Sequence, residues 1–175
     1  MCRALNQYIG YVQGLMQASQ AQVFLEQRIV VPNTSNRVWG TLDCGAYVPA
    51  GQLFVVDLKY GKGHVVGPTV PQLKLYALGL ADLVKVEDPD IAVTLTVCQP
   101  RAGCEPLRSH QTTLGELWQW NDFEVHPALE RIKAGDTDEH AGSHCRWCVR
   151  QTECKAFARM HQDRAADAFD DEGLF

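Results

Sequence analysis

The stretch Leu53-Phe54-Val55-Val56-Asp57-Leu58-Lys59-Tyr60 decides the fold. Its apolar, β-branched start predicts a buried β-strand, and the Gly-rich segment 61–67 that follows predicts where this strand ends. Because side chains alternate between the two faces of a strand, Asp57 and Lys59 are expected to point the same way and Leu58 the other way. The sequence therefore places a carboxylate and an ammonium group together at a strand end.

The segments around this strand follow from their hydrophobic periodicity and from turn residues. The remaining strands are predicted at 23–31, 38–48 and 90–98. Helices are predicted at 3–20, 70–83, 114–120, 127–133 and 154–168. The stretch between the last strand and residue 114 is read as a loop, because it contains Gly103 and Pro106. Hairpin strands followed by a crossover helix predict an α/β fold with a mixed β-sheet flanked by helices.

The bulk properties favour one soluble domain. The chain has 175 residues, of which 46% are hydrophobic and 21% are charged. It shows neither a secretory signal nor an apolar run of membrane-spanning length, so we expect a cytoplasmic protein without a membrane partner. The formal net charge of −5 counts against broad DNA coating, but not against an enzyme whose metal ions supply positive charge. We expect a core at 1–135 and, packed on the same domain, a cysteine-rich segment with an acidic tail at 136–175.

A second carboxylate is expected beside the first. Asp43 lies near the end of the preceding strand, and a hairpin between the two strands can bring it next to Asp57. Carboxylates hold Mg²⁺ or Mn²⁺, which neutralises a phosphate and lowers the pKa of a bound water. Lys59 could then assist the attacking water, and Glu26 on the first strand is a candidate third ligand. The alternative is a surface ion pair between Asp57 and Lys59, with Asp43 solvated.

The helix after the catalytic strand adds two polar side chains. Gln72 and Tyr76 are four residues apart, so they share one face of the predicted helix. On their own, these two residues are better explained as a polar helix start followed by a core tyrosine. Their value lies in combination with the two strands that precede them.

Taken together, these positions carry a family resemblance. The set Gly40-x-x-Asp43, Asp57-x-Lys59 and Gln72-x-x-x-Tyr76 resembles the RecB-type branch of the PD-(D/E)xK nucleases. A family of phage and prophage proteins of this type is similar in four places: Gly40-Thr41-Leu42-Asp43, Val56-Asp57-Leu58-Lys59-Tyr60-Gly61-Lys62-Gly63, Gln72-Leu73 with Tyr76-Ala77-Leu78-Gly79, and Gln99-Pro100-Arg101. The resemblance covers nearly the whole chain.

The resemblance implies a role for each matched residue. Asp43 and Asp57 would be metal ligands, and Lys59 would be the catalytic lysine. Gln72 and Tyr76 would help to position DNA or the metal site. Two further basic residues, Lys62 and Arg101, are candidates for phosphate contacts, with solvated surface charge as the alternative.

Three cysteines form a second candidate metal site. Cys145 and Cys148 are three residues apart, and Cys154 follows near a predicted helix start. Sulfurs at this spacing can share one metal ion, whereas a chance grouping is the alternative. RecB-type relatives that bind iron-sulfur clusters show a similar trio and add a cysteine far upstream. By that resemblance Cys2 would complete a [4Fe-4S] site.

This chain departs from the relatives' pattern at its start, because Cys2 does not lie within a longer N-terminal helical segment. If Cys2 does not serve, His144 or His140 could be the fourth ligand, which would favour Zn²⁺, or the site could be empty.

The sequence predicts a metal-dependent deoxyribonuclease. By the resemblance it is expected to be an exonuclease in phage recombination or replication, with DNA and a phage protein as partners in a bacterial host. The alternatives are a non-cutting module that binds DNA or protein, and a structural zinc protein. The sequence leaves the oligomeric state open.

Overall fold

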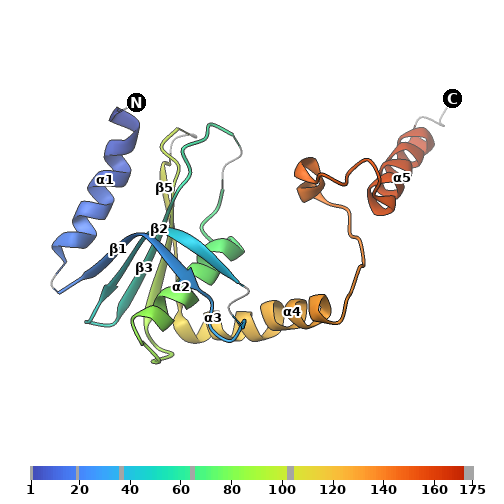
Figure 1. Ribbon diagram of the computed structural model, residues 1–175. Helices are drawn as coiled ribbons and strands as arrows, with labels where there is room; N and C mark the ends of the chain where they lie inside the picture. The colour runs from blue at the N-terminus through green and yellow to red at the C-terminus, as the bar shows by residue number, and fades with distance from the viewer. Residues whose placement is uncertain (1, 19, 36–37, 64–65, 102–104, 172–175) are drawn as a thin grey trace. The chain divides into compact units, whose positions relative to one another are not determined.

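The computed structural model describes residues 2–18, 20–35, 38–63, 66–101 and 105–171, without the side chains of 2–4 and 168–171. The chain forms two compact units, 1–129 and 130–175. The division falls inside a helix, six residues before the expected segment start at 136. In chain order the first unit contains α1 (Cys2–Gln17), β1 (Gln22–Val30), β2 (Trp39–Val48), β3 (Gln52–Leu58), α2 (Pro71–Leu83), β4 (Ala92–Cys98), β5 (Leu107–Thr113) and α3 (Leu114–Trp120) (Figure 1).

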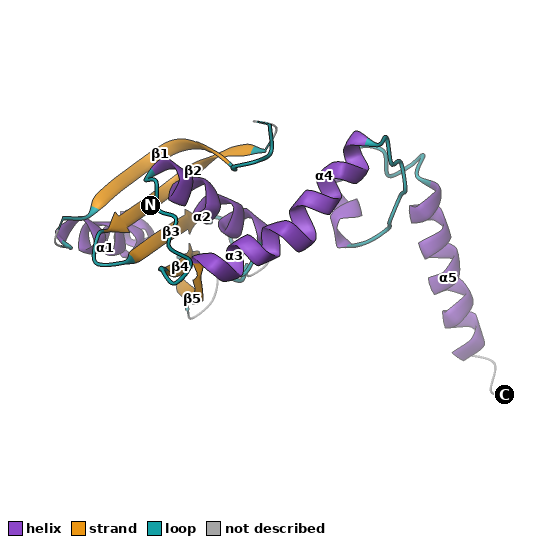
Figure 2. Cartoon of the chain, turned by 90° about the horizontal axis from the view of Figure 1, so that it is seen from below, coloured by secondary structure: helices purple, strands orange, loops and turns teal. Residues whose placement is uncertain are grey.

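The first unit is built on one five-stranded mixed sheet with the strand order β1-β2-β3-β4-β5. All neighbouring strands are antiparallel except β3 and β4, which run parallel. The parallel pair requires a crossover, and α2 supplies it (Figure 2). The predicted α/β class, a mixed sheet flanked by helices, is therefore confirmed.

Helices α1 and α2 cover opposite faces of this sheet (Figure 1). On β3, Val55 packs in the larger core with α2, whereas Val56 packs in a smaller cluster with α1. Both side chains are fully buried, which explains why this strand reads as a continuous apolar run. The smaller cluster also contains Val12 and Leu15 of α1, and these residues hold the helix on the sheet.

The fifth strand corrects the prediction of a loop before residue 114. β5 pairs with the whole of β4, from Cys98 opposite Leu107 to Ala92 opposite Thr113. Its sequence, LRSHQTT, has no alternation of apolar and polar residues, because β5 is an edge strand whose middle residues are exposed. Strand pairing, rather than burial of its own side chains, places this segment in the sheet.

The helical region after β5 is continuous. Thr113 caps α3 through a reciprocal pair of hydrogen bonds with Glu116. A π-helical turn, η1 (Asn121–Val125), then connects α3 to α4 (His126–Lys133). The two helices predicted here are therefore confirmed, but no loop separates them.

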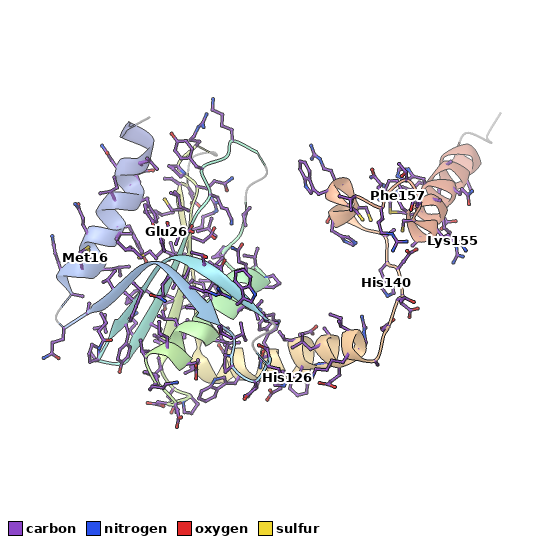
Figure 3. All side chains as sticks on the ribbon, in the orientation of Figure 1. Met16, Glu26, His126, His140, Lys155 and Phe157 are labelled. Carbon is purple, nitrogen blue, oxygen red and sulfur yellow. The ribbon has the colours of Figure 1, made fainter. Side chains whose placement is uncertain are left out.

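The second unit contains a short 3₁₀-helix, η2 (Ser143–Trp147), and the helix α5 (Lys155–Asp171). Lys155 and Phe157 lie in α5, whereas His140 lies in the irregular segment before η2 (Figure 3). In the part of the chain that the structure describes, no helix combines the length and apolar character needed to cross a membrane.

Candidate active site at the end of β2 and β3

The site begins where β2 and β3 separate. The last pair in their ladder is Cys44 opposite Val56, so the next facing positions are Asp43 and Asp57. Here a side chain replaces the ladder, because Oδ2 of Asp43 accepts a hydrogen bond of 2.7 Å from the backbone N–H of Leu58. This bond anchors the first carboxylate beside the second, as the hairpin predicts.

Asp57 is a buried carboxylate with incomplete hydrogen bonding. Only 2% of the residue is exposed, and burial raises its pKa, opposed by the hydrogen bond and charge of Lys59. The ammonium Nζ of Lys59 donates to Oδ1 at 3.1 Å. It also lies 3.0 Å from Oδ2, close enough for an ion pair, but its orientation leaves Oδ2 without a hydrogen bond. The predicted shared orientation of Asp57 and Lys59 is confirmed.

Helix α2 extends this pair into a chain of hydrogen bonds. Nζ of Lys59 also donates to Oε1 of Gln72 at 3.2 Å, and Nε2 of Gln72 donates to the hydroxyl of Tyr76 at 3.0 Å. The predicted shared face of Gln72 and Tyr76 is therefore confirmed. The amide of Gln72 links the lysine to the tyrosine and fixes the direction in which the ammonium group points.

Gly40 allows Tyr76 to complete this chain. A Cβ atom at Gly40 would lie 2.7 Å from Cε1 of Tyr76, closer than real Cβ contacts. The phenol ring thus packs directly against the backbone of β2. This close approach gives a physical reason for glycine at the first position of the Gly40-x-x-Asp43 pattern.

Glu26 faces Asp43 across the β1–β2 pair. Leu25 is opposite Cys44 and Gln27 is opposite Leu42, which leaves Glu26 and Asp43 facing each other without ladder pairing. The backbone of Glu26 has a φ of +49°, a left-handed conformation that is uncommon for a non-glycine residue.

At Glu26 strand β1 changes the face that it presents to α2. Phe24 and Ile29 both pack in the core on the α2 side, although an odd separation would place them on opposite faces of a regular strand. The side chain of Glu26 is exposed (Figure 3) and lines a recess of about 280 Å³ together with Asp43 and residues of α1. This position keeps Glu26 near Asp43 rather than in the chain formed by Lys59 and Gln72.

Tyr8 of α1 lines the same recess. Burial is the main cause that raises its pKa, and negative charge at Cys44, Asp43 and Glu26 adds to the effect. The phenol is therefore neutral at physiological pH. The recess thus combines two carboxylates with a neutral hydroxyl group, a polar set on the side of the sheet that α1 covers.

Lys62 and Arg101 are exposed on loops that follow β3 and β4. Because these strands are parallel, both loops lie at the same end of the sheet as Asp57. The guanidinium of Arg101 lies 4.9 Å from the ring centroid of Tyr60. The described residues record no hydrogen bond or ion pair between either basic side chain and the Asp57–Lys59 pair.

Sequence reasoning missed Arg108 as a positioning residue. Its guanidinium donates to the carbonyl oxygen of Val66 at 2.9 and 3.1 Å and to Oε1 of Gln99 at 2.7 Å. That same Oε1 accepts the backbone N–H of Val66 at 3.2 Å. These bonds tie the loop between Lys59 and α2 to β4 and β5. The sequence does not reveal this role, because Arg108 belongs to β5, which lies in the segment before residue 114 that contains Pro106 and predicts a loop.

The carboxylates suit a hard cation. Mg²⁺ binds through one or two carboxylates, keeps several waters and takes oxygens from substrate phosphates. Asp43 and Asp57 supply such a pair, and Oδ2 of Asp57 is a buried acceptor without a donor. Among the residues that the structure describes, no group of three or more His, Cys, Asp or Glu side chains is arranged to hold one metal ion. The structure therefore provides two candidate ligands, and the role of Glu26 as a third ligand stays a prediction.

The predicted cysteine site lies in the second unit. Cys145 is buried in η2 and its sulfur accepts the N–H of Gly142 at 3.3 Å, while Cys154 accepts the N–H of Phe157 at 3.4 Å. Cys148, which directly follows η2, is exposed. These three thiols are free and, within the described residues, do not form a preassembled metal site.

The residues predicted to complete this cysteine site, Cys2 and a histidine, give no further support for a bound metal. Cys2 begins α1, but its side chain lies outside the described residues. His144 places Nε2 3.0 Å from the carbonyl oxygen of His140, so its imidazole is engaged with the backbone. The arrangement described here thus does not fit an iron-sulfur cluster or zinc without a change in the thiol positions.

Comparison with protein families gives a match over nearly the whole chain. No curated protein matches the chain. A family model described as "Protein of unknown function (DUF2800)" matches residues 1–174 and thus nearly the whole sequence, both units included. The chain therefore belongs to the DUF2800 family.

Proposed function

We propose that this chain is a metal-dependent deoxyribonuclease of the PD-(D/E)xK type. The observation that carries the proposal is the convergence of Asp43, Asp57 and Lys59 at one strand end. The Leu58 N–H anchors Asp43, and Asp57 keeps a buried oxygen without a hydrogen-bond donor. A buried carboxylate oxygen in this state favours a bound cation, because a buried polar atom without a hydrogen-bond partner is costly.

The chemistry follows from these positions. A Mg²⁺ or Mn²⁺ ion held by Asp43 and Asp57, with Glu26 as a further ligand, would neutralise phosphate charge and lower the pKa of a bound water. Lys59 is held by Asp57 and Gln72, and it would orient or deprotonate the attacking water or stabilise charge on the phosphate. Gln72 and Tyr76 would keep the ammonium directed at the reacting group. Lys62 and Arg101 would contact phosphates of the DNA at the same end of the sheet.

The biological setting is part of the proposal. By resemblance to phage and prophage proteins, the enzyme would act as an exonuclease on DNA ends in phage recombination or replication. It would work in the cytoplasm of a bacterial host, with a phage protein as partner. A non-cutting module that binds DNA or protein is the outcome if no metal supports cleavage.

We also propose that the cysteines of the second unit bind a structural metal group, a [4Fe-4S] cluster or Zn²⁺, with a histidine of the same unit as a candidate fourth ligand. The spacing of Cys145, Cys148 and Cys154 supports this, as do the backbone N–H groups donated to two of the sulfurs. Binding would require an arrangement of the thiols other than the one described, in which they do not form a preassembled metal site. Metal and sulfide analysis of protein purified without oxygen tests it, and protein free of iron and zinc would contradict it.

The nuclease proposal is tested by cleavage of linear and circular DNA, single- and double-stranded, in Mg²⁺, Mn²⁺ or EDTA. The account predicts cleavage that requires a metal ion and is lost in Lys59→Ala. Lys74→Ala is a matched control, because Lys74 lies on α2 and its ammonium packs 4.9 Å from the Trp120 ring instead of entering the site. Cleavage that persists in Lys59→Ala would contradict the assigned role.

A further inference from the structure

The β1–β2 hairpin extends past the end of β3. β1 and β2 remain paired as far as Val30 opposite Trp39, whereas the described pairing between β2 and β3 begins only at Cys44. The first residues of β2 therefore project beyond the strand that carries Asp57. Side chains on this extension thus lie beyond the last described pair of β2 and β3.

An aromatic ring and a guanidinium group are stacked on this extension. Trp39 is 57% exposed, although a large aromatic ring is normally placed where it removes apolar surface from water. The guanidinium carbon of Arg28, an exposed residue of β1, lies 4.3 Å from the centroid of the Trp39 ring. The pair thus combines a planar apolar surface with positive charge.

The hairpin is also connected to the candidate active site. Trp39 and Gly40 line a cavity of about 290 Å³ whose other wall is α2, including Gln72 and Tyr76. Gln72 in turn holds the ammonium of Lys59. Trp39 therefore lines the same cavity as Gln72, the residue that accepts the hydrogen bond from Lys59.

We infer that Arg28 and Trp39 form a stacking platform for an unpaired nucleobase of the DNA strand that Asp57 and Lys59 would cut. The inference rests on the proposed nuclease function and narrows its substrate to single-stranded DNA or to a frayed end. Unpaired bases stack on aromatic rings and on guanidinium planes, and the positive charge suits the adjoining phosphate. A base inside a duplex offers no free face to the ring unless it is first unstacked.

The second unit provides a matched control for this pair. Trp147 is 80% exposed, and the guanidinium of Arg146 lies 5.1 Å from its ring centroid. The chemistry is the same, but this pair belongs to η2 rather than to the hairpin beside the site. Trp147→Ala therefore tests whether removal of an exposed tryptophan beside an arginine is enough by itself to weaken binding.

The test measures binding apart from cutting. In the full chain carrying Lys59→Ala, the affinity for a fluorescent single-stranded oligonucleotide and for the matching duplex is compared with and without Trp39→Ala. The platform predicts about tenfold weaker binding of the single strand, in line with the usual loss when a stacking ring is removed, and unchanged binding of the duplex. Trp39→Phe should retain most of the affinity, and Trp147→Ala should retain all of it.

Three results would overturn the inference. They are unchanged single-strand binding in Trp39→Ala, an equal loss in Trp39→Ala and Trp147→Ala, and an equal loss for single strand and duplex. Circular dichroism checks that each variant folds. If Trp39→Ala does not fold, Arg28→Ala replaces it, and this variant should weaken binding of the single strand but not of the duplex. If the wild-type chain shows metal-dependent cleavage but not this binding pattern, the platform is contradicted and the nuclease proposal stands. If the binding pattern is found but no cleavage occurs, the platform stands and the nuclease proposal is contradicted.

Discussion

The carboxylate of Asp43 accepts a 2.7 Å hydrogen bond from the backbone N–H of Leu58, the residue between Asp57 and Lys59. Two strands that have stopped pairing are thereby held together by a side chain of one of them. The bond orients the first carboxylate, and it also fixes the backbone of the segment that carries the second carboxylate and the lysine. Asp43 therefore has a structural role besides its proposed metal-binding role.

Replacing Asp57 by Asn should stabilise the metal-free protein while abolishing cleavage. Burial raises the pKa of Asp57, so its ionised form is penalised in the folded state. The stability that Asp57 contributes is present below its unfolded pKa of about 3.9 and is lost as pH rises through its higher folded value. In EDTA, the Tm of Asp57→Asn should exceed that of the wild type at pH 7, and the two should converge near pH 4.

The same variant should not respond to metal. Mg²⁺ stabilises a protein when it binds the folded state and not the unfolded state. Mg²⁺ should therefore raise the Tm of the wild type but not of Asp57→Asn. Asp82→Asn is a control, because Asp82 is an exposed residue of α2 that pairs with Lys85 at 3.4 Å. Equal metal responses in all three proteins would argue against Asp57 as a ligand.

Gln72→Leu should lower the rate of cleavage without unfolding the protein. Gln72 is exposed and joins Lys59 to Tyr76, so its loss frees the ammonium from one of its two anchors. We expect kcat to fall by about tenfold, a modest share of the usual general acid-base contribution, with KM nearly unchanged. Gln72→Glu, which keeps an acceptor for Lys59, should recover part of the rate; a rise in KM alone would instead indicate a DNA contact.

Gly40→Ala should destabilise the protein by about 1–3 kcal/mol, the usual cost of inserting a group into a packed site. The new Cβ would lie 2.7 Å from Cε1 of Tyr76 and would push the phenol away from Gln72. Denaturant unfolding measures the loss. Substituting Tyr76→Leu in the same chain should relieve it, and Gly10→Ala, where a Cβ meets nothing within 4 Å, should be harmless. An equal cost in both alanine variants would contradict the packing argument.

The cysteines should differ sharply in reactivity. Cys44 is fully buried, and burial followed by the charge of Asp43 raises the pKa of its thiol to about 11. Its thiolate form, the nucleophile, is therefore scarce at pH 8 and increases only as the pH approaches that value. Peptide mapping after iodoacetamide treatment of the native protein should find Cys148 modified and Cys44 intact. Early modification of Cys44 would show that α1 does not cover it.

The sequence was most informative where one strand carries both the core and the chemistry. Alternation alone predicts that Asp57 and Lys59 share a face, because the strand is regular up to Leu58, the residue directly before Lys59. The hairpin also predicts that Asp43 comes near Asp57, since antiparallel pairing follows from the strand order. The four predicted strands, α1 and α2 are all confirmed, because each contains either a continuous apolar run or a clear apolar period.

Other parts of the site depend on features that no periodicity reveals. The left-handed backbone of Glu26 changes the face of β1 within the strand, so its orientation could not be derived from alternation. Arg108 acts from an edge strand that gains its place by pairing with β4, and its polar sequence shows no buried face. The contact of Tyr76 with Gly40 joins a helix to a strand and requires the three-dimensional packing.

The central claim is that Lys59 and the two aspartates form one metal-dependent catalytic group. It is tested most directly by cleavage of linear single-stranded DNA by the wild-type chain and Lys59→Ala, both shown to be folded, with Mg²⁺, Mn²⁺ or EDTA. The account predicts degradation by the wild type with metal, none in EDTA, and none by Lys59→Ala under any condition. Equal degradation by both proteins, or none by a folded wild type with either metal, would contradict it.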